Sequence, residues 1–499
     1  MPKKIHSIVN GVSQPSMSGR FHEVFNPATG EQTGQVDLCS AAEVSAAVAA
    51  AKAALPEWAA TPPMKRIRCL FNFKVLLESN AQRIAHLLSE EHGKTLDDAM
   101  GELSRGIEVV DFCCGIPHLL KGEFSRDVGT GVDTYSDRQP LGVVAGITPF
   151  NFPVMVPMWM YPVAVACGNT FVLKPSERDP SAGLLVQELI AEAGFPAGVI
   201  NMVMGDKEAV DTLLTHADVK AVSFVGSTPI AEYVYRTGTA NGKRIQALGG
   251  AKNHMVIMPD ADMEQVADAL MGAVYGSAGE RCMAISVAVP VGEETADRLI
   301  DIMRPRIEAL RVGPATETNS QMGPLITRAS LDRVSGYLDK GVADGATLVV
   351  DGRKQRQTAW SNGYFIAGSL FDHATTEMSI YKDEIFGPVL VVVRTDSFAA
   401  ALEMVNVHEY GNGAAIFTRD GDCARTFANA VQAGMVGVNV PIPVPVSSHS
   451  FGGWKRSLFG DHAIYGPEGV HFYTRLKTVT TRWPAGIRSG VQFDFPTLE

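Results

Sequence analysis

The chain has 499 residues, 46% hydrophobic and 19% charged, a composition that supports a large buried core and excludes a disordered, collagenous or low-complexity protein. Its 43 basic and 54 acidic residues give a net charge of −11, which argues against nucleic acid as a partner and favours a metabolic protein. At roughly 150 residues per domain, the length predicts about two to four domains or lobes.

The cysteine pattern and the start of the chain predict the compartment. Seven irregularly spaced cysteines include no CxxC pair and no cluster with zinc spacing, so we expect a reducing compartment, no disulfide framework and no metal. The first residues lack the features of signal and transit peptides, which predicts a cytoplasmic location. Leu141–Leu173 carries no charge, but its four prolines favour a buried strand, loop and helix over a membrane span.

The first part of the chain is predicted to be mainly helical. Helices are expected over Ala41–Leu55 (ending at Pro56), Pro63–Asn80, Ala81–His92 and Thr95–Cys114. Short strands are expected at Val132–Tyr135 and Leu141–Ile147, with a turn at Arg138–Pro140 between them.

Strands and helices then alternate in two series. The first comprises strands Thr170–Leu173, Val199–Val203, Ala221–Val225 and Arg244–Leu248, and helices Ala182–Ala193, Lys207–Thr215 and Ile230–Gly238. The second comprises helices Glu264–Tyr275, Thr295–Arg311, Ser330–Asp344, Phe398–Asn406 and Asp422–Val431, and strands Ser286–Val291, Val389–Val393, Gly413–Phe417 and Met435–Val440. Such alternation predicts an α/β fold with mostly parallel sheets in two lobes. Phe472–Trp483 is expected to form a strand outside both lobes.

Two segments are candidates for chemistry on residue type alone. Gly226-Ser227-Thr228-Pro229 joins an apolar strand to a helix whose free N–H groups suit a pyrophosphate, although an ordinary strand-to-helix turn has the same pattern. Cys282 follows a small, glycine-bearing segment and the cation Arg281, a setting that favours a nucleophilic thiolate, although most cysteines are inert core residues.

Six ordered motifs make the chain resemble the aldehyde dehydrogenase superfamily over nearly its full length. They are Thr148-Pro-Phe-Asn151-Phe-Pro153, Leu173-Lys174-Pro-Ser-Glu177, Phe224-Val-Gly226-Ser227-Thr228, Gly279-Glu-Arg-Cys282, Glu384-Ile-Phe386-Gly-Pro388 and Phe451-Gly-Gly-Trp-Lys. The resemblance implies a Rossmann-like NAD-binding lobe, an α/β catalytic lobe and a β oligomerisation arm.

The resemblance also implies roles for individual residues. Cys282 is the nucleophile that attacks the aldehyde, and Asn151 helps to form the oxyanion hole. Hydride passes to NAD and leaves a thioester on the cysteine. The implied cofactor-binding residues are Lys174 and Glu177 at the adenosine ribose, Gly226 and Ser227 at the pyrophosphate, Glu384 at the nicotinamide ribose, and Phe150 and Phe386. An acidic Glu177 favours NAD over NADP.

Each of these assignments has an ordinary structural alternative. Asn151 could cap a turn, Lys174 and Glu177 could form a solvated pair, and Glu384 could be surface charge before a Gly-Pro turn.

One motif departs from the hydrolytic members of the superfamily. Their general-base glutamate precedes a Gly-Gly-Lys sequence, whereas this chain has Ala247 or Leu248 there, depending on the alignment. The following Gly-Ala-Lys-Asn-His and Arg-Cys-Met-Ala sequences resemble the CoA-acylating methylmalonate-semialdehyde dehydrogenases, which oxidise and decarboxylate malonate or methylmalonate semialdehyde to acetyl- or propionyl-CoA. Glu280 departs from that subgroup, which usually has glutamine two residues before the cysteine.

Two arginines are candidates for binding the substrate carboxylate. Arg281 is next to the thiol, and Arg105 matches the subgroup in its Arg-Gly-Ile-Glu context. The alternative for Arg105 is an ion pair with Glu102 or Glu108 on an exposed helix.

The expected organisation is an NAD-binding domain over 1–122 and 142–251, a catalytic domain over 252–470, and an oligomerisation arm over 123–141 and 471–499. Edge strands in the arm predict a homodimer or homotetramer. Two alternatives remain: a hydrolysing dehydrogenase that uses another base, such as Glu280, and a catalytically silent member that acts as a binding protein. Neither the preference between the two semialdehydes nor the CoA-binding residues can be read from the sequence.

Overall fold

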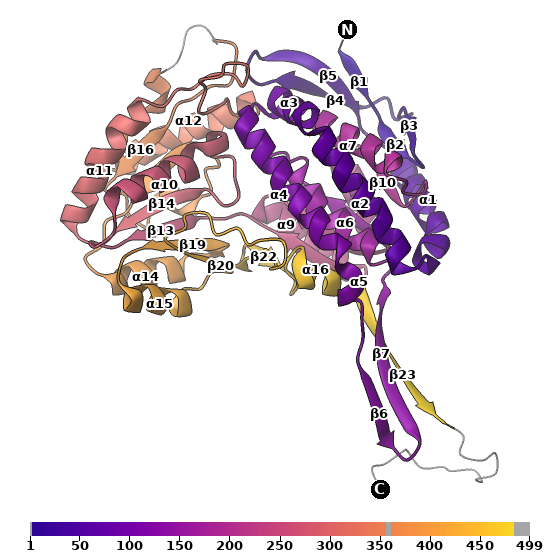
Figure 1. The fold of residues 1–499 in the computed structure, drawn as a ribbon. Helices are drawn as coiled ribbons and strands as arrows, with labels where there is room; N and C mark the ends of the chain where they lie inside the picture. The colour runs from indigo at the N-terminus through magenta and orange to yellow at the C-terminus, as the bar shows by residue number, and fades with distance from the viewer. Residues whose placement is uncertain (1, 356–360, 484–499) are drawn as a thin grey trace.

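The computed structural model describes residues 2–355 and 361–483. Two α/β lobes lie side by side, and a three-stranded arm projects from one of them (Figure 1). The predicted α/β class is therefore confirmed. Among the described residues, no helix is both long and apolar enough to cross a bilayer.

The first lobe is built on an eight-stranded sheet in the order β22-β12-β11-β8-β9-β10-β2-β3. Its strands are β2 (Ser7–Val9), β3 (Val12–Gln14), β8 (Val143–Ile147), β9 (Thr170–Lys174), β10 (Ile200–Met202), β11 (Val219–Val225), β12 (Arg244–Leu248) and β22 (Leu458–Phe459). The five strands β12, β11, β8, β9 and β10 run parallel, so their carboxyl ends share one edge. β22 comes from the predicted catalytic segment, yet it pairs with β12 at the margin of this sheet.

Helices surround this sheet. They are α1 (Ala41–Ala60), α2 (Pro63–Ser79), α3 (Ala81–His92), α4 (Leu96–Cys114), α5 (Ile116–Leu119), α6 (Met155–Ala166), α7 (Ser181–Glu192), α8 (Lys207–Thr215), α9 (Thr228–Ala240) and α16 (Gly466–Tyr473). Every residue of α6 is buried, which explains why the uncharged stretch Leu141–Leu173 is so apolar: it forms β8, a loop, α6 and β9, as predicted.

The second lobe contains a seven-stranded sheet in the order β15-β16-β17-β14-β13-β19-β20. The strands are β13 (Asn253–Ile257), β14 (Ile285–Pro290), β15 (Thr347–Val350), β16 (Ser369–Asp372), β17 (Val389–Val392), β19 (Gly413–Phe417) and β20 (Met435–Val438). Its helices are α10 (Met263–Tyr275), α11 (Glu293–Glu308), α12 (Arg328–Ala343), α13 (Ser379–Lys382), α14 (Phe398–Val407) and α15 (Gly421–Ala430). All strand pairs are parallel except β15–β16.

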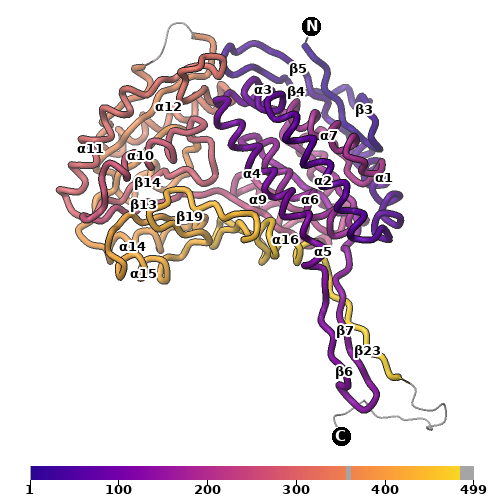
Figure 2. The backbone as a smooth tube through the Cα atoms, viewed as in Figure 1, coloured from indigo at the N-terminus to yellow at the C-terminus, as the bar shows by residue number. Residues whose placement is uncertain are grey.

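Smaller sheets complete the fold. β1 (Lys3–Ile5), β4 (Phe21–Asn26) and β5 (Glu31–Asp37) form a three-stranded sheet, and β18 (Tyr410–Gly411) pairs with β21 (Trp454–Lys455). The arm consists of β6 (Phe124–Gly129), β7 (Val132–Pro140) and β23 (Thr474–Arg482), which remain side by side along its length (Figure 2). Of the predicted arm segment 471–499, residues 484–499 lie outside the described residues.

Two local predictions were wrong. α1 does not end at Pro56 but continues to Ala60, because the Trp58 indole N–H donates to the Val165 carbonyl (3.0 Å) and fixes the last turn against α6. Arg138–Pro140 is not a turn but the end of β7, which pairs with Thr474–Leu476. A proline is tolerated at the end of a strand, and a partner more than 300 residues away leaves no local signal.

Candidate active site

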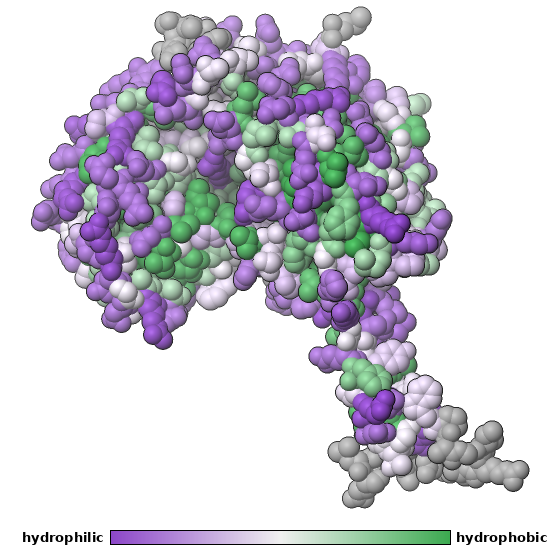
Figure 3. All heavy atoms as spheres, viewed as in Figure 1, coloured by the Kyte–Doolittle hydropathy of each residue, from purple (hydrophilic) through white to green (hydrophobic). Residues whose placement is uncertain are grey.

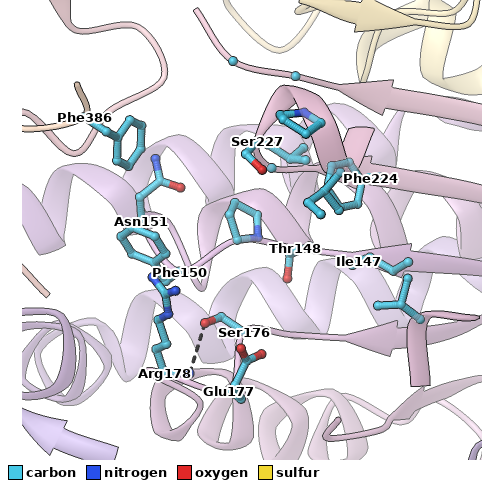
Figure 4. Close-up of a pocket in the computed structure, with 18 of the residues that line it drawn as sticks. Ile147, Thr148, Phe150, Asn151, Ser176, Glu177, Arg178, Phe224, Ser227 and Phe386 are labelled. Carbon is cyan, nitrogen blue, oxygen red and sulfur yellow. Dashed lines mark hydrogen bonds between the residues drawn. The ribbon is translucent and has the colours of Figure 1, made fainter. Parts of the chain in front are cut away.

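A cavity of about 960 Å³ opens between the two lobes. It lies at the carboxyl ends of β8, β9 and β11, where ligands bind in open parallel sheets. The second lobe contributes α12, Glu384 and Phe386 to the opposite wall. Figure 4 shows Phe150, Asn151 and Phe386 gathered at one side of the cavity, and Ser227 with Phe224 at another.

The segment that carries Asn151 is fixed by a buried ion pair. Lys94 bonds to Glu102 (2.6 Å) and also donates to the Asn151 carbonyl oxygen (2.7 Å). The other Glu102 oxygen accepts the backbone N–H groups of Val154 and Met155, and thereby caps the start of α6. The backbone at Asn151 is therefore held by Lys94, just before α4, and Asn151 lines the cavity.

Lys174 and Glu177 form an ion pair of 2.9 Å at the cavity wall. Burial, the largest single effect, acts to raise the pKa of Glu177, but the Lys174 ammonium, the Glu177 backbone N–H and Arg178 together hold that pKa below its usual value. Because Lys174 is almost fully buried, this is not a solvated surface pair. Arg178, which sequence reasoning missed, lies with its guanidinium 4.9 Å from the centre of the Phe150 ring and also lines the cavity (Figure 4).

The Gly226–Ser227 turn leads from β11 into α9. A Cβ atom at Gly226 would lie 2.5 Å from the tip of the Phe224 ring, so any larger residue would require this ring to move. Ser227 is the N-cap residue, but its side chain makes no capping hydrogen bond. Pro229 has no N–H, and the N–H groups of Ile230 and Ala231 donate to the Ser227 carbonyl (3.0 and 2.9 Å), so the N–H groups of Ser227 and Thr228 are the ones suited to an anion at this turn.

Cys282 follows a turn with an unusual backbone. Ser277 and Ala278 have φ values of 54° and 52°, a left-handed conformation that non-glycine residues rarely adopt. Asp98 of α4 holds this turn, because one carboxylate oxygen accepts the Ser277 N–H (3.0 Å) and the other pairs with the Arg281 guanidinium. The charge of Arg281 is therefore largely directed at Asp98.

Burial and, to a lesser extent, the neighbouring Glu384 carboxylate raise the pKa of Cys282 to about 12. The N–H groups of Cys282 and Met283, and then Arg281, act in the opposite direction. The sequence predicted that Arg281 favours the thiolate. Its effect has that sign but is smaller than the effect of burial.

Glu384 and Phe386 lie on the second-lobe side of the cavity. Glu384 accepts the Ala251 N–H (3.0 Å), and burial raises the pKa of Glu384 to about 7. This carboxyl is half-buried at the cavity wall and is not surface charge. Phe386 has a φ of 57° and meets the Phe150 ring edge-on, with ring centres 5.9 Å apart.

The cavity brings together nine of the eleven predicted site residues: Phe150, Asn151, Lys174, Glu177, Gly226, Ser227, Cys282, Glu384 and Phe386. The two arginines do not line it. Arg105 pairs with Glu108 (2.6 Å), the structural alternative anticipated from the sequence, and donates to the Pro445 carbonyl (2.7 Å). Arg333, which the sequence did not single out, does line the cavity from α12.

No carboxylate occupies the position of a hydrolytic base. Ala247 and Leu248 are buried in β12, where they pair with β22. Glu280 is completely buried and lies against His92 (3.9 Å) and the Ile326 N–H (3.3 Å), and it does not line the cavity. Within residues 2–355 and 361–483, no group of three or more His, Cys, Asp or Glu side chains is arranged to hold a metal ion.

Comparison with known proteins extends this picture. The pattern of the aldehyde dehydrogenase family matches residues 14–479. A malonate-semialdehyde dehydrogenase of Pseudomonas aeruginosa is 60% identical over 495 residues, or 99% of each chain. The crystal structure of a protein from Sinorhizobium meliloti 1021, described as a methylmalonate-semialdehyde dehydrogenase and complexed with NAD, is 58% identical with a TM-score of 0.97 and covers 98% of this chain and 99% of its own. A methylmalonate-semialdehyde dehydrogenase of Oceanimonas doudoroffii is 57% identical with a TM-score of 0.96, covering 97% and 99%.

The buried Glu280 gives a testable pH dependence. Burial raises the pKa of Glu280 to about 8, so between about pH 4.5 and pH 8 the folded chain binds more protons than the unfolded chain. Folded-state stability contributed by this group therefore falls as the pH rises through that window. Glu280→Gln removes the ionisable group, and we expect its melting temperature to exceed that of the unchanged protein by about 2–4 °C at pH 8, with a smaller difference at pH 5. Glu403→Gln, at an exposed site on α14, is the matched control. A difference that does not change with pH would show that Glu280 does not titrate in this way.

Proposed function

Since the chain belongs to the aldehyde dehydrogenase family, we propose that it is a cytoplasmic, NAD-dependent and CoA-acylating dehydrogenase of malonate or methylmalonate semialdehyde. The family prediction made from six motifs is confirmed. One observation carries the finer proposal. Cys282 and Asn151 line the same cavity as the start of α9, and the residues at the position of the hydrolytic base, Ala247 and Leu248, are apolar. The names of the relatives from Pseudomonas and Oceanimonas support the substrate class.

The residues at the cavity fit a dinucleotide. The glycine turn at Gly226 allows close approach of a pyrophosphate to the N-terminus of α9, where Ser227 has a free hydroxyl. Lys174 and Glu177 offer a donor and an acceptor for ribose hydroxyls, and the carboxylate disfavours a 2′-phosphate. Glu384 is proposed to hold the nicotinamide ribose, with Phe150 and Phe386 beside the nicotinamide ring. When bound, NAD supplies the hydride acceptor.

The chain's own residues would perform the acylation. The Cys282 sulfur attacks the aldehyde carbon, and the carbonyl oxygen becomes an oxyanion. We propose that the Asn151 amide and the Cys282 N–H donate to that oxygen. The Lys94 bond to the Asn151 carbonyl supports this role, because it holds the segment in place. Loss of hydride from the same carbon leaves a thioester on Cys282.

Deacylation distinguishes the proposal from its alternatives. Neither Ala247 nor Leu248 can take a proton from water, and Glu280 faces His92 instead of the cavity. CoA depends less than water on a general base, because a thiol ionises far more readily than water and its thiolate attacks a thioester well. In the semialdehyde, the carboxylate lies β to the new thioester carbonyl, so CO₂ can leave as an enolate forms.

We predict ping-pong kinetics with a burst. Without CoA, single-turnover mixing with semialdehyde should give about one NADH per active site and then a phase slower by about 10²–10⁴, which is what a general base contributes. Adding CoA should restore turnover and yield acyl-CoA and CO₂. The burst is measured by NADH absorbance in a stopped-flow instrument.

Cys282→Ala is the control for this experiment. It should bind NAD, measured by fluorescence titration, but show neither burst nor turnover. A linear, CoA-independent time course ending in free acid would favour a hydrolytic enzyme, and NAD binding without any turnover would favour a silent family member.

We propose further that Arg105 and Arg281 select for the substrate carboxylate. Arg105 is already paired with Glu108, and Arg281 with Asp98. A substrate carboxylate would have to share each arginine with its acidic partner or displace that partner. Burial raises the pKa of Tyr465, and the charges of Arg105 and Cys282 both act on it. Arg105 and Cys282 are therefore both near Tyr465, which supports a place for Arg105 close to the nucleophile.

Arg105→Leu and Arg281→Leu should lower kcat/KM for the semialdehyde more than for propanal, which lacks the carboxylate. A charge-assisted hydrogen bond contributes about 1.5–3 kcal/mol, or roughly tenfold to a hundredfold in selectivity. Arg304→Leu, at an exposed site on α11, is the matched control. Equal losses on both substrates would assign the arginines to structural support, which for Arg281 means support of the turn that Asp98 holds.

The arm is proposed to join subunits into a homodimer or homotetramer. Its three strands expose the large apolar side chains Phe124, Tyr135 and Leu476, and apolar residues are visible along its shaft in Figure 3. Among the strands that the structure describes, β23 and β6 are the edge strands of the arm sheet, and β20 is one of the two edge strands of the second-lobe sheet. Free edges of this kind are usually covered.

Leu476→Asp should therefore shift the protein toward smaller species in sedimentation velocity, because a charge would be buried at the contact. Met64→Asp, at an equally exposed apolar site on α2, should leave the assembly unchanged. If both variants sediment like the unchanged protein, the arm does not form the contact.

A further inference from the structure

The backbone carbonyl of Cys282 is held by two asparagine side chains. Asn253 Nδ2 donates to it at 2.9 Å and Asn412 Nδ2 at 3.1 Å. Asn253 begins β13 and Asn412 immediately precedes β19, and these two strands are neighbours in the second-lobe sheet. Two adjacent strand ends thus converge on the peptide that follows the thiol.

Further contacts make this arrangement rigid. Asn253 also donates to the Ala284 carbonyl (3.0 Å) and accepts the Gly413 N–H (3.0 Å), so all its polar atoms are used. Asn412 also donates to the Met283 sulfur (3.0 Å). Both asparagines are buried, and a Cβ atom at Gly413 would lie 2.6 Å from the end of the Met283 side chain. The sheet therefore packs closely against the Met283 side chain, while the two asparagines hold the Cys282–Met283 peptide.

The position of this peptide matters for the thiol. The carbonyl of Cys282 and the N–H of Met283 belong to the same planar amide, so fixing one fixes the other. The Met283 N–H hydrogen bond is among the contacts that lower the pKa of Cys282, against the larger effect of burial. A carbonyl that accepts two hydrogen bonds also polarises its own amide, which strengthens the N–H as a donor.

We propose that Asn253 and Asn412 are positioning residues for the nucleophile: by holding the Cys282 carbonyl, they keep the Met283 N–H directed at the sulfur and stabilise the thiolate. This inference rests on the proposed function only in taking Cys282 as the nucleophile. The need for such support follows from the surroundings, since Arg281 is paired with Asp98 and Glu384 opposes the thiolate. The backbone N–H groups are then the main donors left to the sulfur.

The test measures thiol ionisation instead of turnover. In Asn412→Leu, a side chain of similar size without donors, the pH midpoint of thiolate absorbance near 240 nm, taken as the difference from Cys282→Ala, should rise by about 0.5–1 unit. The rate of alkylation by iodoacetamide at a fixed pH below the midpoint should fall about threefold to tenfold, since one pKa unit is tenfold in thiolate. Asn253→Ala should act in the same direction, and the double variant should shift the midpoint further than either single variant.

Asn406→Leu is the matched control. Asn406 is a partly buried asparagine of the same lobe that bonds to the Ala430 carbonyl and the Gln432 N–H, away from the thiol. It should leave the midpoint unchanged even if the melting temperature falls. A slower alkylation with an unmoved absorbance midpoint would mean that the asparagines only affect access to the thiol, and would overturn the proposal.

The outcomes separate this inference from the proposed function. If peptide mapping finds the alkylated residue at a cysteine other than Cys282, the nucleophile is misassigned and the proposed function fails. If Cys282 is alkylated but its midpoint is the same in the folded Asn412→Leu and Asn253→Ala variants, only the positioning role is wrong.

Discussion

The short segment Gly249–Asn253 is the constraint on which the site depends. β12 of the first sheet ends at Leu248 and β13 of the second begins at Asn253, so four residues join the two lobes. Each is tied to a different part of the chain: the Gly249 N–H to the Ser457 carbonyl, the Gly250 N–H to Thr228 at the start of α9, the Ala251 N–H to Glu384, and the Lys252 ammonium to the carbonyls of Ile380 and Asp383. One linker thus sets the distance between the anion-binding helix end, Glu384 and the nucleophile.

The glycines of this linker are tightly packed, and the two residues before them are buried. A Cβ atom at Gly249 would lie 2.8 Å from the Arg456 carbonyl oxygen, and one at Gly250 would lie 2.5 Å from the Glu384 carboxylate. The preceding residues, Ala247 and Leu248, are held in register by β22 and have no exposure to the cavity. A carboxylate here would be buried without a cation, which is energetically costly. Under the CoA proposal, deacylation is carried out by a nucleophile that needs little activation.

Sequence reasoning identified what depends on local pattern and missed what depends on distant contact. α3, α8, β12 and β19 have the predicted bounds, because periodicity and terminal residues define them. The strand β13 was missed although it lies inside a sheet, since Asn253 and His254 at its start give it little strand character. Lys94, Glu102 and Asn412 could not be recognised as site residues, because each acts through a partner more than 50 residues away. The sequence predicted that Arg281 acts on the thiol because the two residues are adjacent. Only the fold shows that the Arg281 guanidinium is paired with Asp98.

The electrostatics around Cys282 has a consequence for the order of events. In the chain alone, burial and Glu384 outweigh the backbone donors and Arg281, so the pKa of Cys282 stands near 12 and the thiol is protonated at neutral pH. A resting thiol of this kind resists oxidation and alkylation, since the thiolate is the reactive form. A positive charge brought into the cavity beside the sulfur would lower that pKa by direct attraction, more strongly than in water because the site is buried. Activation would then follow occupation of the cavity, and the asparagine-held peptide would keep the Met283 N–H in place to stabilise the thiolate as it forms.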